Sequence, residues 1–474
     1  MQNEEPVWRL VDRHGPDYIA LADRVWDMPE IAYNEYKSCA EHRRMLERDG
    51  FRITENLAGI PTAIMGEAGE GGPVIAILGE YDALPGLSQE AGVAEPRPLP
   101  GDGMGHGCGH NLLGSASLLA ATAVKDYLAE HKLPGRVRYY GCPAEEGGAA
   151  KAFMVREGCF DDVDIAISWH PSAFTGVNDA MSLANTRVDF TFTGRASHAA
   201  AAPHLGRSAL DAVELMNVGV NYMREHMPSD ARIHYAMLDG GGIAPNVVQA
   251  TAKVRYAIRA RELGELLPLI ARVKKVAEGA ALMTETKVSF TTISAVSNLL
   301  ANVPLERSMY QAMTRLGPPP FDDEDKRLAA KFQETLSAED ISSSYRRVGM
   351  AVKPDTPLCD VIVPLDAKGA PMMGSTDVGD VSWAVPTVQA RGATYAIGTP
   401  GHSWQLTAQG KSGIAHKGLI HVAKIMASTA VDALENPALV EQAKADHAAR
   451  MAVTPYVSPL PADVRPPIKA LASA

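Results

Sequence analysis

Short apolar segments, each bounded by glycine or proline, alternate with helical patterns through the first third of the chain. After a helical pattern over 16–48, the expected strands are IPTAIMG, PVIAILGEYDAL, RVRYYGC and VDIAISWH, with helices expected at 112–131 and 148–157. Uninterrupted apolar runs suit strands that are buried on both faces, as in a parallel sheet. The alternation therefore predicts an α/β domain.

The order of the expected helices and strands changes near residue 184. From RVDFTFTG to KVSFTTIS the expected order is strand, helix, strand, strand, helix, strand, which is the ferredoxin-like arrangement. We therefore expect an inserted α+β domain at 184–293, flanked by the two parts of the α/β domain at 1–183 and 294–474. Within the last part, 317–360 is expected to be a solvated excursion, and the Pro-rich tail after 452 to be extended.

Length, charge and cysteine content limit the number of domains, the partners and the location that this chain can have. A chain of 474 residues is too long for one ordinary core. Its net charge of −11 argues against nucleic acid or an anionic membrane as partner, because both attract basic surfaces. The longest apolar stretch, 112–124, is too short to span a bilayer and is expected to be a buried helix. Five scattered cysteines and no visible secretory signal favour a cytoplasmic location.

The segment GHGCGHN (105–111) places His106, Cys108 and His110 at alternate positions with glycines between them. In an extended segment, alternate side chains project to one side, so all three could reach a common point. A thiolate and imidazoles gathered at one point are typical ligands of a transition metal. A glycine-rich turn around a buried cysteine is the alternative explanation of this segment taken alone.

Three further motifs place polar side chains at or near expected strand ends. PAEEGG follows a strand and carries Glu145 and Glu146, SWHP ends a strand with His170, and GTPGHSW contains His402. Carboxyl ends of parallel strands meet at one edge of a sheet, where α/β proteins build their sites. Taken singly, each motif also fits a solvated glutamate pair or a capping or core histidine. Together they predict a site in which one carboxylate binds metal and its neighbour holds water.

Seven motifs, in this order, resemble the amidohydrolase branch of the di-metal aminoacylase and carboxypeptidase family: GEYDALPG, GHGCGHN, PAEEGG, SWHP, GRASHAAAAPHLGRSALDA, GGIAPNVV and GTPGHSW. The resemblance covers about residues 15–435. Several motifs are more similar to the aminobenzoyl-glutamate type of this branch than to hippurate or auxin-conjugate hydrolases. The resemblance implies a zinc-peptidase-like α/β catalytic domain with an inserted ferredoxin-like lid and dimerisation domain.

Carried over motif by motif, the resemblance implies a metal centre, a general base and an orienting carboxylate. The implied metal ligands are Cys108, His110, Glu146, His170 and His402. Cys108 would bridge two ions, Glu145 would be the catalytic base, and Asp82 would orient a ligand imidazole. Capping of the turn before Pro85 is the alternative role for Asp82. His106 is typical of the branch but is usually not a ligand.

The resemblance also implies that the inserted domain contributes to the site. His198 in SHAAAAPH and Asn246 in GGIAPNVV would contact the substrate or the oxyanion, with His198 reaching the site of a neighbouring subunit. A homodimer or higher oligomer is therefore expected, and a related second subunit is a further candidate partner. A helix-entry cap is the alternative for His198, and a turn residue is the alternative for Asn246.

Other residues near the motifs are weaker candidates for substrate contacts. A substrate carboxylate would suit the guanidinium groups of Arg195, Arg207 and Arg259, although each also fits an ordinary surface charge. An aromatic acyl group would suit an apolar wall made of Trp383, Trp404 and Phe174.

At two positions this sequence differs from the pattern of the hippurate and auxin-conjugate hydrolases, which weakens the transfer of their substrate contacts to this chain. Asn111 stands where an Asp commonly follows Cys-Gly-His, and STDVGDVSW replaces a Glu-Asp-Phe segment. In that second segment Asp377 and Asp380 either lie near the metals or cap a glycine-rich loop.

The expected activity is metal-dependent hydrolysis of the amide bond of a small N-acyl or N-aroyl amino acid. Two divalent ions, Zn²⁺ or Mn²⁺ with Co²⁺ also suited, would supply an activated water. Two alternatives use the same residues: hydrolytic deamination of an aromatic amine, and a non-catalytic partner subunit that binds metal structurally. Release of ammonia would mark the first, and a closed coordination shell would mark the second.

Overall fold

A computed structural model describes residues 5–370 and 374–468 of the chain, so the outermost parts of the expected domain ranges, 1–4 and 469–474, lie outside it. The larger of its two sheets has the strand order β1-β2-β4-β3-β5-β11-β6. These strands are β1 (Arg52–Glu55), β2 (Ile64–Glu70), β3 (Val74–Glu80), β4 (Gly135–Cys142), β5 (Ile165–Ser172), β6 (Gly176–Val177) and β11 (Thr387–Ala393). Neighbouring strands among β4, β3, β5 and β11 are parallel, as the apolar runs predict.

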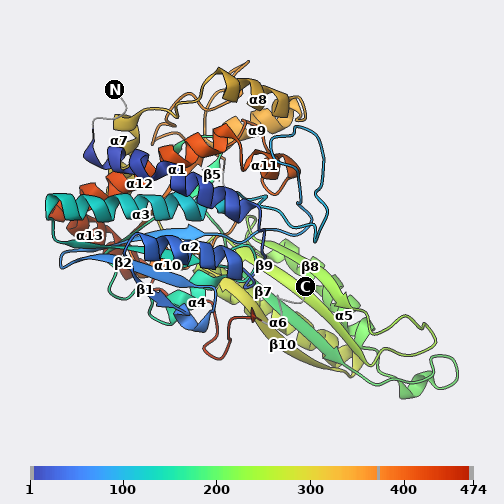
Figure 1. The fold of residues 1–474 in the computed structure, drawn as a ribbon. Helices are drawn as coiled ribbons and strands as arrows, with labels where there is room; N and C mark the ends of the chain where they lie inside the picture. Colours follow the sequence, from blue (N-terminus) through green and yellow to red (C-terminus); the bar gives the residue numbers. More distant parts are fainter. Residues whose placement is uncertain (1–4, 371–373, 469–474) are drawn as a thin grey trace.

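Helices cover both faces of this sheet. Helices α1 (Pro6–Trp26), α3 (His110–His131) and α12 (Gly413–Glu435) pack together on one side, and α4 (Ala150–Arg156) and α10 (Val378–Ala384) lie on the other (Figure 1). Along β3, Ile75 and Ile77 belong to the core under α3, whereas Ala76 and Leu78 belong to the core under α4. A strand buried on both faces explains the uninterrupted apolar sequence.

The smaller sheet is antiparallel, with the order β10-β7-β9-β8. It consists of β7 (Ala184–Thr193), β8 (Arg232–Asp239), β9 (Thr251–Ala260) and β10 (Lys287–Val296), with α5 (Ala209–Met223) and α6 (Leu263–Thr284) on one face. Figure 1 shows this unit projecting from the rest of the molecule. The two-part architecture confirms the predicted fold class, while the boundaries at 184 and 293 stay predictions.

Two expectations from the sequence were wrong in detail, and a third, for the tail, gains a tertiary contact. The pattern over 16–48 is two helices, α1 and α2 (Tyr36–Arg48), separated by a turn. Region 317–360 is not merely solvated: it contains α8 (Asp323–Gln333) and α9 (Ala338–Arg347), which bury Phe332 and Tyr345. The chain after 452 has no helix or strand from Thr454 to Pro467, but Tyr456 is anchored through its hydroxyl to Asp380.

The remaining helical segments complete the larger unit or connect elements. They are α7 (Val303–Leu316), α11 (Trp404–Gln409), α13 (Pro437–Val453) and the short 3-10 turns η1 (Leu57–Gly59), η2 (Pro203–Leu205) and η3 (Arg224–His226). None of the helices in the described part of the chain has the length and apolar character needed to cross a membrane. The apolar stretch 112–124 is the buried interior of α3, as expected.

The strand order of the larger sheet reverses direction at the carboxyl end of β3, which is a topological switch point. The chain leaves β3 through α3 to reach β4 on one side, and it then passes through α4 to reach β5 on the other side of β3. Because α3 and α4 cover opposite faces, the segments that follow β3, β4 and β5 diverge around one opening. GEYDALPG, PAEEGG and SWHP lie at or next to these strand ends, and GHGCGHN leads into α3.

Candidate metal centre

The structure brings the five predicted metal ligands together at the carboxyl edge of the larger sheet. Three groups of candidate ligand atoms lie within 4.8 Å of one another: Cys108 with His110 and His170, Cys108 with Glu146 and His402, and Glu80 with His110 and Glu145. Because Cys108 belongs to two groups, a single thiolate can face two ions at once.

The segment 105–111 is a turn that leads into α3, which differs from the extended segment predicted. Gly109 has a φ of 79°, a left-handed conformation that favours glycine, and it lets His110 begin the helix directly after Cys108. Cys108 Sγ lies 3.4 Å from His170 Nε2. His106 points away from this cluster, because its Nε2 lies 3.1 Å from the carbonyl of Val25. Alternation alone therefore overstated the role of His106.

Asp82 ties two candidate ligands to each other. Its Oδ1 lies 2.9 Å from His110 Nδ1, and its Oδ2 accepts a hydrogen bond of 2.9 Å from the backbone N–H of Glu146. A proton on Nδ1, donated to Asp82, leaves the Nε2 lone pair of His110 available for a metal. That Nε2 is buried and has no hydrogen-bond partner among the described residues. The contacts of Asp82 agree with the orienting role predicted for it.

His402 approaches Glu146 from the loop before α11. Its Nε2 lies 3.2 Å from Glu146 Oε1, although this contact lacks hydrogen-bond geometry. The backbone of His402 is left-handed, with a φ of 55°, and its N–H donates to the carbonyl of Gly107 at 3.0 Å. The loop is thereby fixed to the Cys108 turn, even though the His402 side chain is 54% exposed.

The turn that carries Glu145 and Glu146 is held from both domains. Ala144 has a left-handed φ of 56°, and its N–H donates to the buried carboxylate of Glu35 at 2.9 Å. From β7, the Arg187 guanidinium donates to the carbonyls of Gly147 and Glu146 at 3.1 and 3.3 Å. A non-glycine residue in this conformation costs about 1 kcal/mol or more and persists because its surroundings hold it. Arg187 therefore joins the smaller sheet to the candidate catalytic turn.

Burial and neighbouring charges raise the pKa values of several titratable groups in the site. Burial and the nearby carboxylates of Glu80 and Glu146 raise the pKa of Glu145 well above its usual value. Burial also raises the pKa of the Cys108 thiol, and Glu146 adds to this shift. Burial works against a charged His110, yet Cys108 and a neighbouring aspartate raise its pKa well above the ordinary value. A divalent cation would relieve this accumulation of acidic groups, since it favours their ionised forms.

Two charged residues beside the cluster were missed from the sequence. Glu80, the last residue of β3, and Lys151, in the first turn of α4, form a buried ion pair of 2.6 Å, and Lys151 also contacts Asp377 at 2.6 Å. Asp377 therefore binds a lysine instead of capping its own loop, and Asp380 binds Ser297. The acidic residue at a strand end was the available signal for Glu80, but lysine is rarely buried and gave none.

Several predicted substrate contacts lie elsewhere in this chain. His198 and Asn246 are exposed on loops at the projecting end of the smaller unit, where His198 Nδ1 accepts from the N–H groups of Ala200 and Ala201. The aromatic wall is not formed: Phe174 is buried against Tyr345, Trp383 donates to the carbonyl of Asn298, and Trp404 packs near Phe332. Arg195 and Arg207 pair with each other through their backbones.

Asn111, the departure in the CGHN motif, also has a structural role. Its Nδ2 donates to the carbonyls of Ala22 and Gly410, at 3.3 and 3.1 Å. The side chain therefore connects α1 to the end of α11 and points away from the metal ligands.

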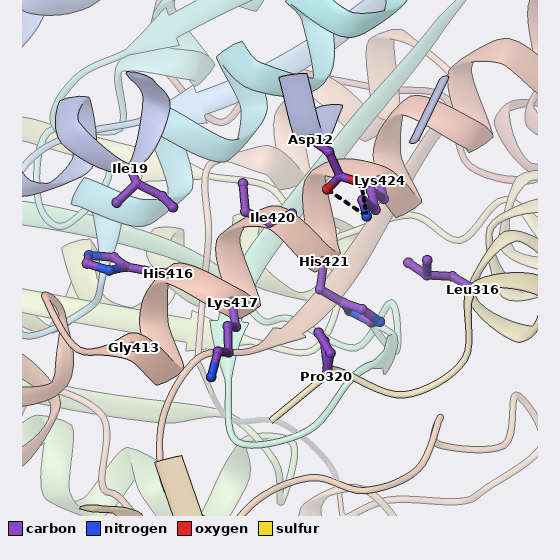
Figure 2. A pocket seen from close by; sticks show the side chains of 10 residues that line it. All are labelled: Asp12, Ile19, Leu316, Pro320, Gly413, His416, Lys417, Ile420, His421 and Lys424. Atoms are coloured by element: carbon purple, nitrogen blue, oxygen red, sulfur yellow. Dashed lines mark hydrogen bonds and ion pairs between the residues drawn. The ribbon is translucent and has the colours of Figure 1, made fainter. Parts of the chain in front are cut away.

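A cavity of about 420 Å³ lies away from this site, between α1, α12 and the segment that follows α7 (Figure 2). Its wall is formed by Asp12, Ile19, Leu316, Pro320, Gly413, His416, Lys417, Ile420, His421 and Lys424. The charged Asp12 and Lys424 in this wall pair with each other at 2.8 Å. None of the predicted site residues lines it, so the cavity is separate from the group of candidate ligands at the strand ends.

Comparisons with known proteins agree with this geometry. Residues 76–406 match the family model described as peptidase family M20/M25/M40. One of the subunits of the p-aminobenzoyl-glutamate hydrolase of Escherichia coli K12 is 46% identical to this chain, over 95% of this chain and 96% of the relative.

Solved structures share the fold. A protein from methicillin-resistant Staphylococcus aureus aligns with a TM-score of 0.65 at 15% identity, covering 92% of this chain and 100% of that one. A Bacillus subtilis protein, described as a dinuclear metal-binding peptidase of the M20 family, aligns with a TM-score of 0.57 at 19% identity, over 90% of this chain and 99% of its own. The family resemblance of the sequence motifs is thereby confirmed, and the chain belongs to peptidase family M20/M25/M40.

Proposed function

We propose that this chain is a metal-dependent amidohydrolase that releases an amino acid from an N-acyl or N-aroyl conjugate of the aminobenzoyl-glutamate kind. Membership of the family makes it a hydrolase of carbon–nitrogen bonds. The observation that carries the proposal is the position of Cys108, shared by two groups of ligand atoms, with the Glu145 carboxylate in the adjoining group. The name of the Escherichia coli relative supports the substrate class.

The residues present fit a pair of divalent ions. Sulfur, nitrogen and oxygen donors converge, and two of their atoms, His110 Nε2 and Glu146 Oε1, are buried without a hydrogen-bond partner in the described part of the chain. Cys108, Glu146 and His402 would hold one ion, and Cys108, His110 and His170 would hold the other. This mixed donor set suits Zn²⁺. Mn²⁺ or Co²⁺ also fits where the cell supplies that metal instead.

The chain's own residues would move the proton during hydrolysis. Bound divalent ions lower the pKa of a water molecule and polarise the amide carbonyl. Glu145 takes the proton from the attacking water and delivers it to the leaving nitrogen, as a general base and then a general acid. Its raised pKa suits the second step, because a carboxyl group that holds its proton more tightly than usual can carry that proton to the leaving nitrogen. Asp82 keeps His110 and the Glu146 backbone in place throughout.

A substrate carboxylate would be bound by the smaller sheet. Arg259 on β9 is half-buried, and burial lowers its pKa, which marks a guanidinium partly withdrawn from water. On the neighbouring strand β7, Arg259 pairs with Asn185. Two positions further along β7, Arg187 contacts the turn that carries Glu145. Among the three arginines predicted from the sequence, Arg259 therefore has the placement that best suits a fork to carboxylate.

His198 and Asn246 would act in a neighbouring subunit. Both lie on the projecting end of the molecule, and β8 is an edge strand whose Tyr235, Met237 and Leu238 side chains are 44–45% exposed. An exposed apolar edge strand is a surface that another chain can cover. A second copy is the partner we propose, with a related subunit, as the name of the relative suggests, the other candidate. An active monomer in gel filtration would contradict supply of His198 from a neighbour.

Substitution of Glu145 tests the proposal. Glu145→Gln preserves the shape of the side chain but cannot take a proton, so amino-acid release should fall by about 10²-fold or more. The metal content should stay that of the wild type. The assay follows free amino acid and ammonia from a panel of N-acyl and N-aroyl amino acids. Release of ammonia alone would favour the deaminase alternative, and unchanged turnover in Glu145→Gln would reject the assignment.

A further inference from the structure

A buried lysine beside the candidate metal centre has no part in the hydrolysis described so far. Lys151 Nζ lies 2.6 Å from Glu80 Oε1 and 2.6 Å from Asp377 Oδ1, and its backbone N–H donates to Asp377 Oδ2 at 3.0 Å. The side chains of these three residues are 0%, 2% and 0% exposed. A buried ammonium and two carboxylates are costly to desolvate, so the cluster needs a reason beyond stability.

One oxygen of Glu80 is occupied by Lys151, and the other faces His110. Glu80 Oε2 lies 3.3 Å from His110 Nε2, yet this nitrogen has no partner with hydrogen-bond geometry in the described residues. The carboxylate oxygen and the ring nitrogen therefore lie side by side without bonding to each other. Two donors bound to one cation at about 2.0–2.2 Å lie about 3 Å or slightly more apart. The observed separation matches that arrangement.

With a cation bound, His110 would present this nitrogen as an acceptor. Its Nδ1 is 2.9 Å from Asp82 Oδ1, which places the proton on Nδ1 and leaves a lone pair on Nε2. Glu80, His110 and Glu145 offer ligand atoms within 4.8 Å of one another. His110 Nε2 is buried beside the carboxylates of Glu80 and Glu145 and has no hydrogen-bond partner among the described residues. Such a nitrogen is expected in a cation site and not in an acidic cluster alone.

We propose that Glu80 is a sixth metal ligand, binding the cation held by His110 and His170, and that Lys151 is the positioning residue that fixes it there. Lys151 restrains Glu80 through Oε1 and so aims Oε2 at the cation, while Asp377 fixes Lys151. With Glu80 completing this coordination shell, Glu145 is left free to serve the water. The inference rests on the metal centre of the proposed function and adds a ligand to it.

Metal titration of the full-length protein tests this inference. Zn²⁺ is returned to chelator-treated protein in competition with a chromogenic chelator, and bound metal is counted by mass spectrometry. The wild type should bind two ions. Glu80→Gln should lose the second ion or bind it at least about 100-fold more weakly, and Lys151→Met should weaken it about 10- to 100-fold. The matched controls, Glu67→Gln and Lys424→Met, alter charged pairs outside the site and should bind both ions as the wild type does.

The outcomes separate this inference from the proposed function. Two ions bound by Glu80→Gln with wild-type affinity would overturn the ligand assignment, and so would a wild type that binds no second ion. A wild type that binds two ions but releases no amino acid would reject the proposed function and leave the role of Glu80 standing. If Lys151→Met does not fold, as circular dichroism would reveal, the nearly isosteric Glu80→Gln decides alone.

Discussion

Asp82 is the residue on which the geometry of the site depends most. One carboxylate oxygen contacts His110, and the other accepts from the backbone of Glu146, so a single buried side chain orients ligands from two elements. Outer partners of metal ligands typically change metal affinity or activity by about 10- to 100-fold when removed. Asp82 follows the end of β3, and it therefore connects His110 at the start of α3 to the turn after β4.

Asp82→Asn should weaken metal binding by about 10- to 100-fold without unfolding the chain, because the amide keeps the shape but loses the charge that stabilises the His110 tautomer. Metal competition and turnover measured together check this. Asp162→Asn is the matched control, since Asp162 pairs with Arg138 away from the ligands. Equal metal affinity in wild type and Asp82→Asn would contradict the orienting role.

Residues with local signatures were the ones that could be predicted. Cys108, Glu146 and His402 each stand in a short motif at or near a strand end, and the parallel sheet brings such ends together. Glu80 also stands in such a motif, GEYDALPG, at the end of β3, but Lys151 carries no signature, and the pairing of the two depends on β3 and α4 meeting in space across 71 positions of sequence. The separation of His106 from the cluster also depends on tertiary structure, namely the contact of its Nε2 with the carbonyl of Val25 in α1.

Helix α3 connects the core to the site and is packed unusually close to β3. A Cβ added at Gly114 would lie 2.5 Å from the carbonyl oxygen of Glu80 and 2.8 Å from His42 Nε2. The backbone of Glu80 cannot move without displacing the strand end beside His110. The small residues of α3 are therefore a requirement of the site as well as of the core.

Gly114→Ala should destabilise the protein by about 1–3 kcal/mol, since overpacking outweighs the usual gain of about 1 kcal/mol for alanine in a helix. Gly279→Ala in α6 is the matched control: no atom of the described residues lies within 4 Å of the added Cβ, so it should be neutral or stabilising. Urea unfolding of both variants measures the difference. A Gly114→Ala variant as stable as Gly279→Ala would show that α3 can shift freely.

At the level of elements, periodicity predicted the smaller sheet well and region 317–360 poorly. Alternating apolar residues marked β7 and β9, because one face of each packs on α5 and α6. The charged run at the start of α8 suggested solvation, yet Asp322 and Ser337 are the N-caps of α8 and α9 and form capping boxes with Asp325 and Asp340. Those cap signatures, read together with Phe332 and Tyr345, were the signal available for these helices.

The stability of the whole molecule should depend on pH through buried histidines outside the site. Burial lowers the pKa of both His42 and His421 from 6.5 to about 4. Between these values the unfolded chain binds protons that the folded chain does not. The free energy of unfolding should therefore fall as pH drops from about 6.5 to 4, by up to about 1.4 kcal/mol per pH unit for each histidine.

Urea unfolding at pH 7, 6 and 5 in the presence of chelator checks this dependence. The double variant His42→Asn/His421→Asn should lose stability less steeply on acidification than the wild type, because two of the protons taken up on unfolding are removed. Carboxylates contribute equally to both proteins, so the difference in slope isolates the histidines. Parallel slopes would show that these rings are already charged in the folded state.

At the scale of the whole molecule, five side chains from four separate segments are proposed to meet around two cations. Anomalous diffraction from crystals of the full chain grown with Zn²⁺ tests it most directly. Two peaks are expected about 3.5–4 Å apart, on either side of Cys108 Sγ, with Glu146 and His402 at one and His110 and His170 at the other. A single peak, or a pair of peaks that Cys108 does not bridge, would contradict it.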